Sequence, residues 1–181
     1  MKTYYFTPNQ KERLLRIVVD PAHRAALELG FALGARVSEM LLLRVEDVDF
    51  EKGWIRVPDV KKKNRRIVPI SPEVQQVVEY YIQKEKLKPR DRLFSVSDVT
   101  LNNWLRRYSK KTGIEPREEE GNLRWHSLRD SFIREHQDLP QKMLEQMTGD
   151  TIDTLQEYYE EYRPEDIART MRERCDSQEE P

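Results

Sequence analysis

The stretch RWHSLRDSF, residues 124–132, places two different patterns on one predicted helix. Residues three or four positions apart share a face of an α-helix. His126 and Arg129 therefore point one way, whereas Leu128 and Phe132 point another way and suit a core. The spacing predicts a helix with one packing face and one polar face. An isolated HxxR is usually a solvated or salt-bridged pair, so the rest of the chain decides what this one means.

The composition of the chain limits the classes of protein to which it can belong. Of its 181 residues, 36% are charged and 37% are apolar, which fits one soluble domain with a sizeable core. No apolar run approaches the ~20 residues that span a bilayer, and the N-terminal residues lack the features of a signal peptide. The single cysteine, Cys175, excludes an internal disulfide and a cysteine metal cluster. We expect a cytoplasmic protein without a metal.

Charge is distributed unevenly along the chain, although the formal net charge is only −1. Basic residues concentrate in 56–66, 84–92 and 106–111, whereas acidic residues gather at 118–120 and from Glu157 onward. A chain that is neutral overall can still present a basic face, and this local face is what a phosphate backbone meets. The other reading is that each basic run is solvated surface.

Hydrophobic periodicity predicts a mostly helical α+β domain. Between residues 48 and 70 the period changes, and β-branched residues with a turn at Lys52-Gly53 predict a small antiparallel sheet of two or three strands, with 59–64 as a hairpin tip. Helices are expected at about 7–19, 21–34, 36–44, 71–82, 98–112, 126–132, 140–147, 151–162 and 164–175.

Three further segments give the polar face of 124–132 possible partners. In LGARVSEML (33–41), a glycine-marked turn places Arg36 at the start of a helix with Glu39 on the same face. An arginine at that end opposes the helix dipole, so its position makes sense if Arg36 and the helix N–H groups face an anion. The other two segments are the lysine-rich hairpin tip and GDTIDTLQEYY (149–159), which ends in adjacent tyrosines.

The order and spacing of these segments resemble the catalytic domain of the tyrosine recombinases, also called phage integrases. That family's pattern is roughly TGxRxSE, a lysine in a β-hairpin before RxVPL, then HxLRHxF and LGHxxxxTxxxY. Here the corresponding stretches are LGARVSE, VKKKNRRIVPI, HSLRDSF and TGDTIDTLQEYY, within residues 7–164. The resemblance implies the tyrosine recombinase catalytic-domain fold for a single domain over 1–181, with 165–181 as a C-terminal helix and tail.

The resemblance implies roles for the residues that match these motifs. Arg36 and Arg129 would clamp the non-bridging oxygens of the scissile phosphate, since a planar guanidinium matches phosphate bidentately and stays charged. His126 would hydrogen-bond the same phosphate and assist proton removal from the nucleophile. Glu39 would hold an arginine or the histidine in place. Lys61 would protonate the leaving 5′ oxygen, although the neighbouring residues 62–63 are close enough to compete.

A tyrosine would be the nucleophile. An unperturbed tyrosine has a pKa of ~10, so it needs surrounding positive charge to attack at neutral pH. Attack gives a covalent 3′-phosphotyrosyl link and needs neither ATP nor a metal. Counting without gaps from Gly149 assigns the family position to Tyr159; Tyr158 fits if the loop is one residue shorter, and Tyr162 is a third candidate.

The chain departs from the family pattern at several positions. Asp150 stands where the family usually has a histidine or a tryptophan, so it either caps the following helix or weakens the site. Asp130 replaces a common histidine, and Val60 and Lys62 replace the glycines that flank the hairpin lysine. Barely seven residues precede the predicted domain, so we expect the family's N-terminal core-binding domain to be absent.

The resulting expectation is a site-specific DNA recombinase or integrase that acts on double-stranded DNA without a cofactor. The alternatives are a type IB topoisomerase-like nicking-closing activity and a catalytically inactive DNA-binding module of the same fold. Segment 165–181 is expected to mediate self-association on DNA or to pack on its own domain. The expected contacts to the DNA backbone are Lys62, Lys63, Arg65, Arg66, Arg106, Arg107 and Lys110.

Overall fold

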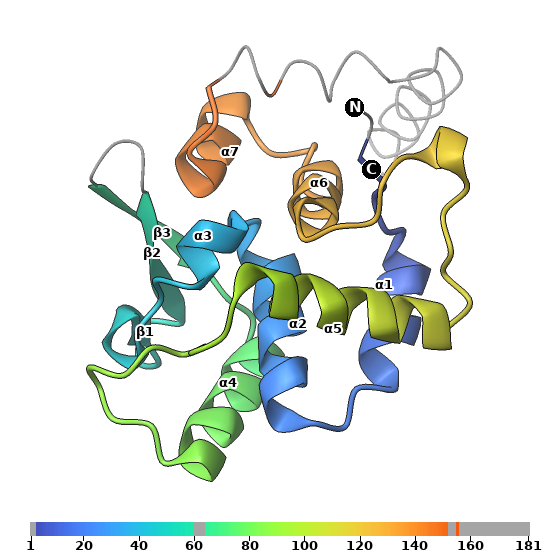
Figure 1. The fold of residues 1–181 in the computed structure, drawn as a ribbon. Coiled ribbons are helices and arrows are strands. Elements are labelled where there is room, and N and C mark those ends of the chain that lie inside the picture. The colour runs from blue at the N-terminus through green and yellow to red at the C-terminus, as the bar shows by residue number, and fades with distance from the viewer. Residues whose placement is uncertain (1–2, 60–63, 152–154, 156–181) are drawn as a thin grey trace, which may run out of the picture.

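A computed structural model describes residues 3–59, 64–151 and 155 of the chain (Figure 1). Seven α-helices, two 3-10 helices and three strands occur in the described part. In chain order they are α1 (Pro8–Arg16), α2 (Pro21–Leu33), α3 (Val37–Met40), η1 (Val45–Asp47), β1 (Val48–Asp49), β2 (Trp54–Asp59), β3 (Asn64–Pro69), α4 (Pro72–Glu85), α5 (Asp98–Lys111), η2 (Glu118–Glu120), α6 (His126–Glu135) and α7 (Gln141–Thr148). No described helix has the length and apolar character needed to cross a membrane.

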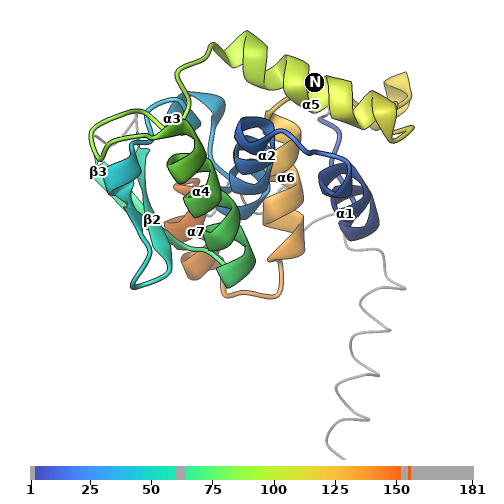
Figure 2. The same ribbon diagram turned by 90° about the horizontal axis from the view of Figure 1, so that it is seen from below.

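Helix α2 is the centre of the fold. Asp20 caps its N-terminus by accepting a hydrogen bond from the backbone N–H of His23, and Pro21 occupies the first helical position. Its sequence AALELGFAL is apolar almost all round, as a helix surrounded by others requires. Helices α4 and α6 lie on either side of α2, and α1 and α5 also contact it (Figure 2). The hydrophobic core is built around this helix.

Two glycines let α2 and the segment after it approach α6 closely. A Cβ on Gly30 would lie 2.5 Å from Cδ1 of Leu128 and 2.9 Å from the Trp125 ring. Gly34, which ends α2 with a left-handed φ of 53°, would place a Cβ 2.5 Å from Cδ1 of Phe132. The positive φ at Gly34 also favours glycine. The packing face of α6 therefore lies directly on the turn that leads into α3.

The sheet is a three-stranded antiparallel meander in the order β1-β2-β3. Val57 pairs with Arg66 and Ile55 with Val68, and all four side chains are buried on one face. Helix α7 packs against β3 (Figure 1). The sequence predicted two or three strands here, and the structure has three; the hairpin tip, residues 60–63, lies outside the described residues.

The third helix is shorter than predicted. The sequence predicts a helix over about 36–44, but α3 ends at Met40, and a turn and η1 follow. The backbone around residue 44 pairs with the loop before α5 instead: Leu93 N–H donates to the carbonyl of Leu43 (2.8 Å) and Val45 N–H to that of Asp91 (3.1 Å). These hydrogen bonds replace the ones that a longer helix would have formed. The apolar stretch 40–43 predicts four core residues, but only Met40 and Leu43 are buried and Leu42 is exposed.

Candidate active site

Arg36 projects from the turn between α2 and α3. Its backbone N–H donates to Oε2 of Glu39 (2.8 Å), and its Nη1 donates to Oε1 of the same carboxylate (3.1 Å). Glu39 is only 1% exposed, whereas the Arg36 side chain is 27% exposed. Glu39 therefore fixes both the start of α3 and the direction of the arginine from the buried side, which leaves part of the guanidinium facing outward.

Arg66 holds Glu39 from the side of the sheet. Its Nη2 donates to Oε2 of Glu39 (2.8 Å), and its Nε donates to the carbonyl of Met147 at the end of α7 (2.7 Å). The sequence placed Arg66 among the DNA contacts on the surface, but its side chain is buried on the inner face of β3. Arg66 thus connects the sheet, α3 and α7 beneath the polar face of the site.

Arg129 is buried at the centre of the site, with a side-chain exposure of 1%. Its Nη1 donates to the carbonyl of Gly34, and its Nη2 donates to that of Thr148 (2.8 Å). Burial lowers the pKa of the Arg129 guanidinium, while the nearby carboxylate of Asp150 raises it. Carbonyls from two separate helix ends therefore hold the second arginine of the HxxR pair in place.

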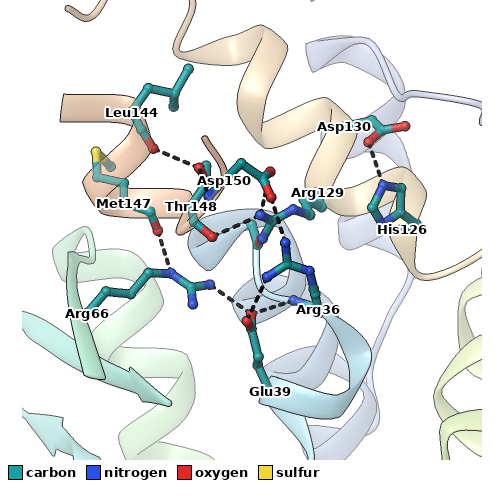
Figure 3. Close-up of polar contacts among 11 residues, drawn as sticks. Arg36, Glu39, Arg66, His126, Arg129, Asp130, Leu144, Met147, Thr148 and Asp150 are labelled. Atoms are coloured by element: carbon teal, nitrogen blue, oxygen red, sulfur yellow. Dashed lines mark hydrogen bonds and ion pairs between the residues drawn. The ribbon is translucent and has the colours of Figure 1, made fainter. Parts of the chain in front are cut away.

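The carboxylate of Asp150 joins the two arginines (Figure 3). Its Oδ1 lies 2.6 Å from Nη2 of Arg36, and its Oδ2 lies 2.5 Å from Nη2 of Arg129. Gly149, with φ 74°, ends α7 in the left-handed region and turns the chain toward the arginines. The backbone N–H of Asp150 then donates to the hydroxyl of Thr148 (3.2 Å). The two guanidinium groups converge on a single anionic group.

The cluster carries more positive than negative charge. Three guanidinium groups (Arg36, Arg66 and Arg129) and two carboxylates (Glu39 and Asp150) leave one net positive charge. In the part of the chain that the structure describes, no three His, Cys, Asp or Glu side chains are arranged to hold a metal ion. The convergence of Arg36 and Arg129 on one carboxylate suits the site to holding an anion.

His126 begins α6, one turn before Arg129, and is partly exposed (Figure 3). Its Nε2 lies 3.2 Å from Oδ1 of Asp130, one turn further along the helix. Burial lowers the pKa of His126; Asp130 opposes this shift, whereas the positive charge of Arg129 adds to it. His126 is thus held by one carboxylate, and its burial favours the neutral imidazole, which is the form that accepts a proton.

Comparison with known proteins assigns the chain to a family. The sequence profile of the Phage integrase family matches residues 5–163. The chain belongs to the phage integrase family. It is 29% identical to the prophage integrase IntF of Escherichia coli (strain K12), over 93% of this chain and 38% of that protein. The chain spans less than half the length of the curated relatives it matches.

Solved structures show the same fold. The crystal structure of XerA recombinase superposes with a TM-score of 0.78 at 21% identity, over 96% of this chain and 64% of that one. XerH site-specific recombinase, in a pre-cleavage complex with its difH substrate, gives a TM-score of 0.76 at 18% identity, over 94% of this chain and 55% of that one. The expected tyrosine recombinase catalytic-domain fold is confirmed.

Within this integrase fold, the structure brings some predicted site residues together and leaves others apart. Arg36, Glu39, Arg129 and Asp150 form one cluster, and His126 lies beside it on α6. The predicted backbone contacts Arg65, Arg106, Arg107 and Lys110 are exposed, Arg65 on β3 and the others on α5. The predictions for Lys61, Lys62, Lys63, Tyr158, Tyr159 and the C-terminal segment 165–181 lie outside the described residues.

The sequence analysis missed two side-chain contacts in the candidate site, one made by Arg66 and one by Asp130. Arg66 alternates with Ile67 along β3 and shares the inward face of Val68, so the two-residue period of a strand could have placed it inside. Asp130 follows His126 by four residues, and this spacing alone could have paired them. No sequence pattern could have identified the carbonyls of Gly34 and Thr148 as partners of Arg129, because every residue has a backbone carbonyl.

Proposed function

We propose that this chain is the catalytic domain of a site-specific DNA recombinase or integrase. It would cleave and rejoin double-stranded DNA through a covalent 3′-phosphotyrosyl intermediate. The observation that carries the proposal is the convergence of Arg36 and Arg129 on one carboxylate. Two guanidinium groups that bind a carboxylate in this way can also bind a phosphodiester. Membership of the integrase family supports this reading, as does the DNA bound to XerH.

In this proposal the two arginines neutralise charge as it grows on the scissile phosphate. Preorganised donors are effective because they need no rearrangement at the moment of reaction. Glu39, Arg66 and the carbonyl of Gly34 supply this preorganisation by holding Arg36 and Arg129 from behind. The site would therefore stabilise a pentacoordinate phosphorus without a metal ion.

The other groups would move protons and form the covalent bond. His126, in its neutral form, would accept a hydrogen bond from the nucleophile or donate one to the phosphate. Tyr159, once its phenolic proton is removed, would attack phosphorus and displace the 5′ oxygen, which Lys61 would protonate to give a 5′ hydroxyl; Tyr158 is the alternative nucleophile. Return of a 5′ hydroxyl, from the same or another strand, would displace the tyrosine and reseal the backbone.

The direct test is to trap the covalent adduct. The protein is incubated at low salt with a library of nicked duplexes whose cleavage releases a short fragment, and the products are separated on a denaturing gel. We expect an adduct with the wild type and with Tyr158→Phe, but not with Tyr159→Phe. Loss with Tyr158→Phe alone would move the nucleophile by one residue. DNA binding without any adduct in the wild type would contradict the proposal and favour a binding module.

A second assay separates strand exchange from simple relaxation. Two duplexes that carry the trapped site and differ in length are mixed with the protein. Recombinant lengths are expected for a recombinase, whereas a nicking-closing enzyme would relax a supercoiled plasmid and return only the parental lengths. The same catalytic residues serve both reactions, so the assay tests strand exchange alone.

A further inference from the structure

We propose that Asp150 is an internal substitute for the scissile phosphate, which must leave Arg36 and Arg129 before DNA can occupy the site. In the DNA-free protein its carboxylate fills the anion position, so the centre is self-inhibited. The inference rests on the proposed function, because it assumes that these two arginines bind a phosphodiester. It adds a competition between a side chain and the substrate for the same donors.

The contacts of Asp150 are those expected for a bound phosphate. Each carboxylate oxygen faces the Nη2 atom of a different arginine, at 2.6 and 2.5 Å. Both contacts join opposite charges and are charge-assisted hydrogen bonds, the stronger class of hydrogen bond. Among the described residues, both partners of this carboxylate are guanidinium groups that the proposal assigns to DNA. Two non-bridging phosphate oxygens would present the same charge to the same atoms.

Burial explains why the DNA-free site needs such an anion. The Arg129 side chain is 1% exposed and the Asp150 side chain 9% exposed, so water solvates neither group well. A buried charge without a partner is costly, and the cost falls when an opposite charge lies in contact with it. Asp150 therefore stabilises Arg36 and Arg129 together while the substrate is absent.

The same contacts exclude a phosphate while they last. Arg129 uses Nη1 for the Gly34 carbonyl and Nη2 for Thr148 and Asp150, so a phosphate can take the place of the carboxylate at Nη2 only when Asp150 moves away. A phosphate bound to Arg36 and Arg129 would also lie close to the Asp150 carboxylate, and the two negative charges would repel each other. Binding of the scissile phosphate and release of Asp150 are therefore coupled.

The local chain around Asp150 makes this release feasible. Asp150 follows Gly149, which ends α7 with a positive φ, and within the described residues its backbone N–H donates to the Thr148 hydroxyl at 3.2 Å. Glu39, in contrast, lies inside α3 and is held by both the backbone and the side chain of Arg36 as well as by Arg66. Of the two carboxylates, Asp150 is the one that can move.

The test measures the binding of inorganic phosphate at the arginines, so it does not depend on catalysis. The full chain, ¹⁵N-labelled, is titrated with phosphate, and the dissociation constant is read from the side-chain N–H signals of Arg36 and Arg129. We expect Asp150→Asn to bind phosphate about tenfold more tightly than the wild type, equivalent to about 1.4 kcal/mol. Asp150→His, which also removes the negative charge, should give the same gain. Glu79→Gln, which removes one charge from the exposed face of α4, should leave the constant unchanged.

A wild-type measurement covers the case in which neither variant folds. The ¹³C signal of the Asp150 carboxylate should shift at the same phosphate concentrations as the Arg36 signal, because one event moves both. Equal or weaker phosphate binding by a folded Asp150→Asn protein, or an Asp150 signal that stays constant while the Arg36 signal shifts, would overturn the inference. Tighter phosphate binding without a DNA adduct would support this inference and contradict the proposed function instead. A wild-type adduct without the gain in phosphate affinity would support the proposed function and contradict this inference.

Discussion

Glu39 and Asp150 are two carboxylates that share one arginine but differ in how the fold holds them. Glu39 contacts Arg36 and Arg66 and is enclosed by α3 and the sheet, whereas Asp150 contacts Arg36 and Arg129 from the end of α7. In the proposal above, the ion pair with Glu39 fixes Arg36 in place, whereas the ion pair with Asp150 blocks Arg36 until a phosphate binds.

The largest loss of folding stability is expected from Glu39→Gln. This change leaves the buried Arg66 without an opposite charge and weakens the support of Arg36, and breaking a buried pair in this way costs about 3–5 kcal/mol. Urea unfolding followed by circular dichroism would measure the loss. A loss no larger than that of Glu79→Gln, which should stay within about 0.5 kcal/mol, would show that Glu39 is not part of the scaffold.

The second largest loss of folding stability is expected from a change at Gly34. This residue lies in the turn that leads to Arg36, and its carbonyl accepts a hydrogen bond from Arg129. Gly34→Ala would force a side chain into φ 53° and within 2.5 Å of Phe132, at a cost of about 1–2 kcal/mol for the conformation and about 1–3 kcal/mol for the crowding. Gly113→Ala is the matched control, because its φ is 68° but its Cβ would meet no atom within 4 Å. Equal unfolding free energies for the two variants would mean that the Phe132 ring moves aside at little cost and that α6 does not fix the turn.

Asp150→Asn should cost less stability than Glu39→Gln. It removes a charge from a pair whose Arg36 side is partly solvated, and the lost charge-assisted hydrogen bonds are worth about 1–3 kcal/mol. The same urea experiment gives the value. If Asp150→Asn proved as damaging as Glu39→Gln, the two carboxylates would be equivalent parts of the scaffold and the comparison would fail.

The smallest effect on folding stability is expected from the titration of His126. Burial lowers its pKa below the unfolded value, so folding favours the neutral form; the associated stability is complete above pH 6.5 and is lost as the pH falls toward the folded pKa. Asp130→Asn removes an influence that raises this pKa, so the pKa should fall further. An NMR titration of the imidazole signals would measure it, with His23 as the internal control. A higher His126 pKa in this variant would show that Asp130 does not act on the ring as its charge requires.

Local patterns in the sequence predict most of the elements of this fold. Caps and prolines mark the starts of α1, α2 and α4, and three- and four-residue spacing marks the buried face of α5. The early end of α3 could not be predicted in this way. Its cause is the pairing of residues 43–46 with the loop at 89–93, a contact between segments that lie far apart in the sequence.

The candidate site shows the same division between local and distant information. The helix-start position of Arg36 and its pairing with Glu39 follow from a few adjacent residues. The contact between Arg36 and Asp150 spans 114 residues, so no spacing rule predicts it. Sequence analysis described Asp150 as a helix cap or a weakening of the site. The structure shows its carboxylate between the two arginines, a third arrangement that requires the folded chain.

The most direct test of the central claim compares the two carboxylates in the reaction itself. Single-turnover adduct formation is timed at saturating nicked duplex for the wild type, Asp150→Asn and Glu39→Gln. If Asp150 competes with the phosphate while Glu39 positions the arginines, Asp150→Asn should react about tenfold faster, equivalent to about 1.4 kcal/mol of barrier, and Glu39→Gln should react more slowly than the wild type. Slower reaction by both variants would contradict the account, because Asp150 would then support the arginines as Glu39 does.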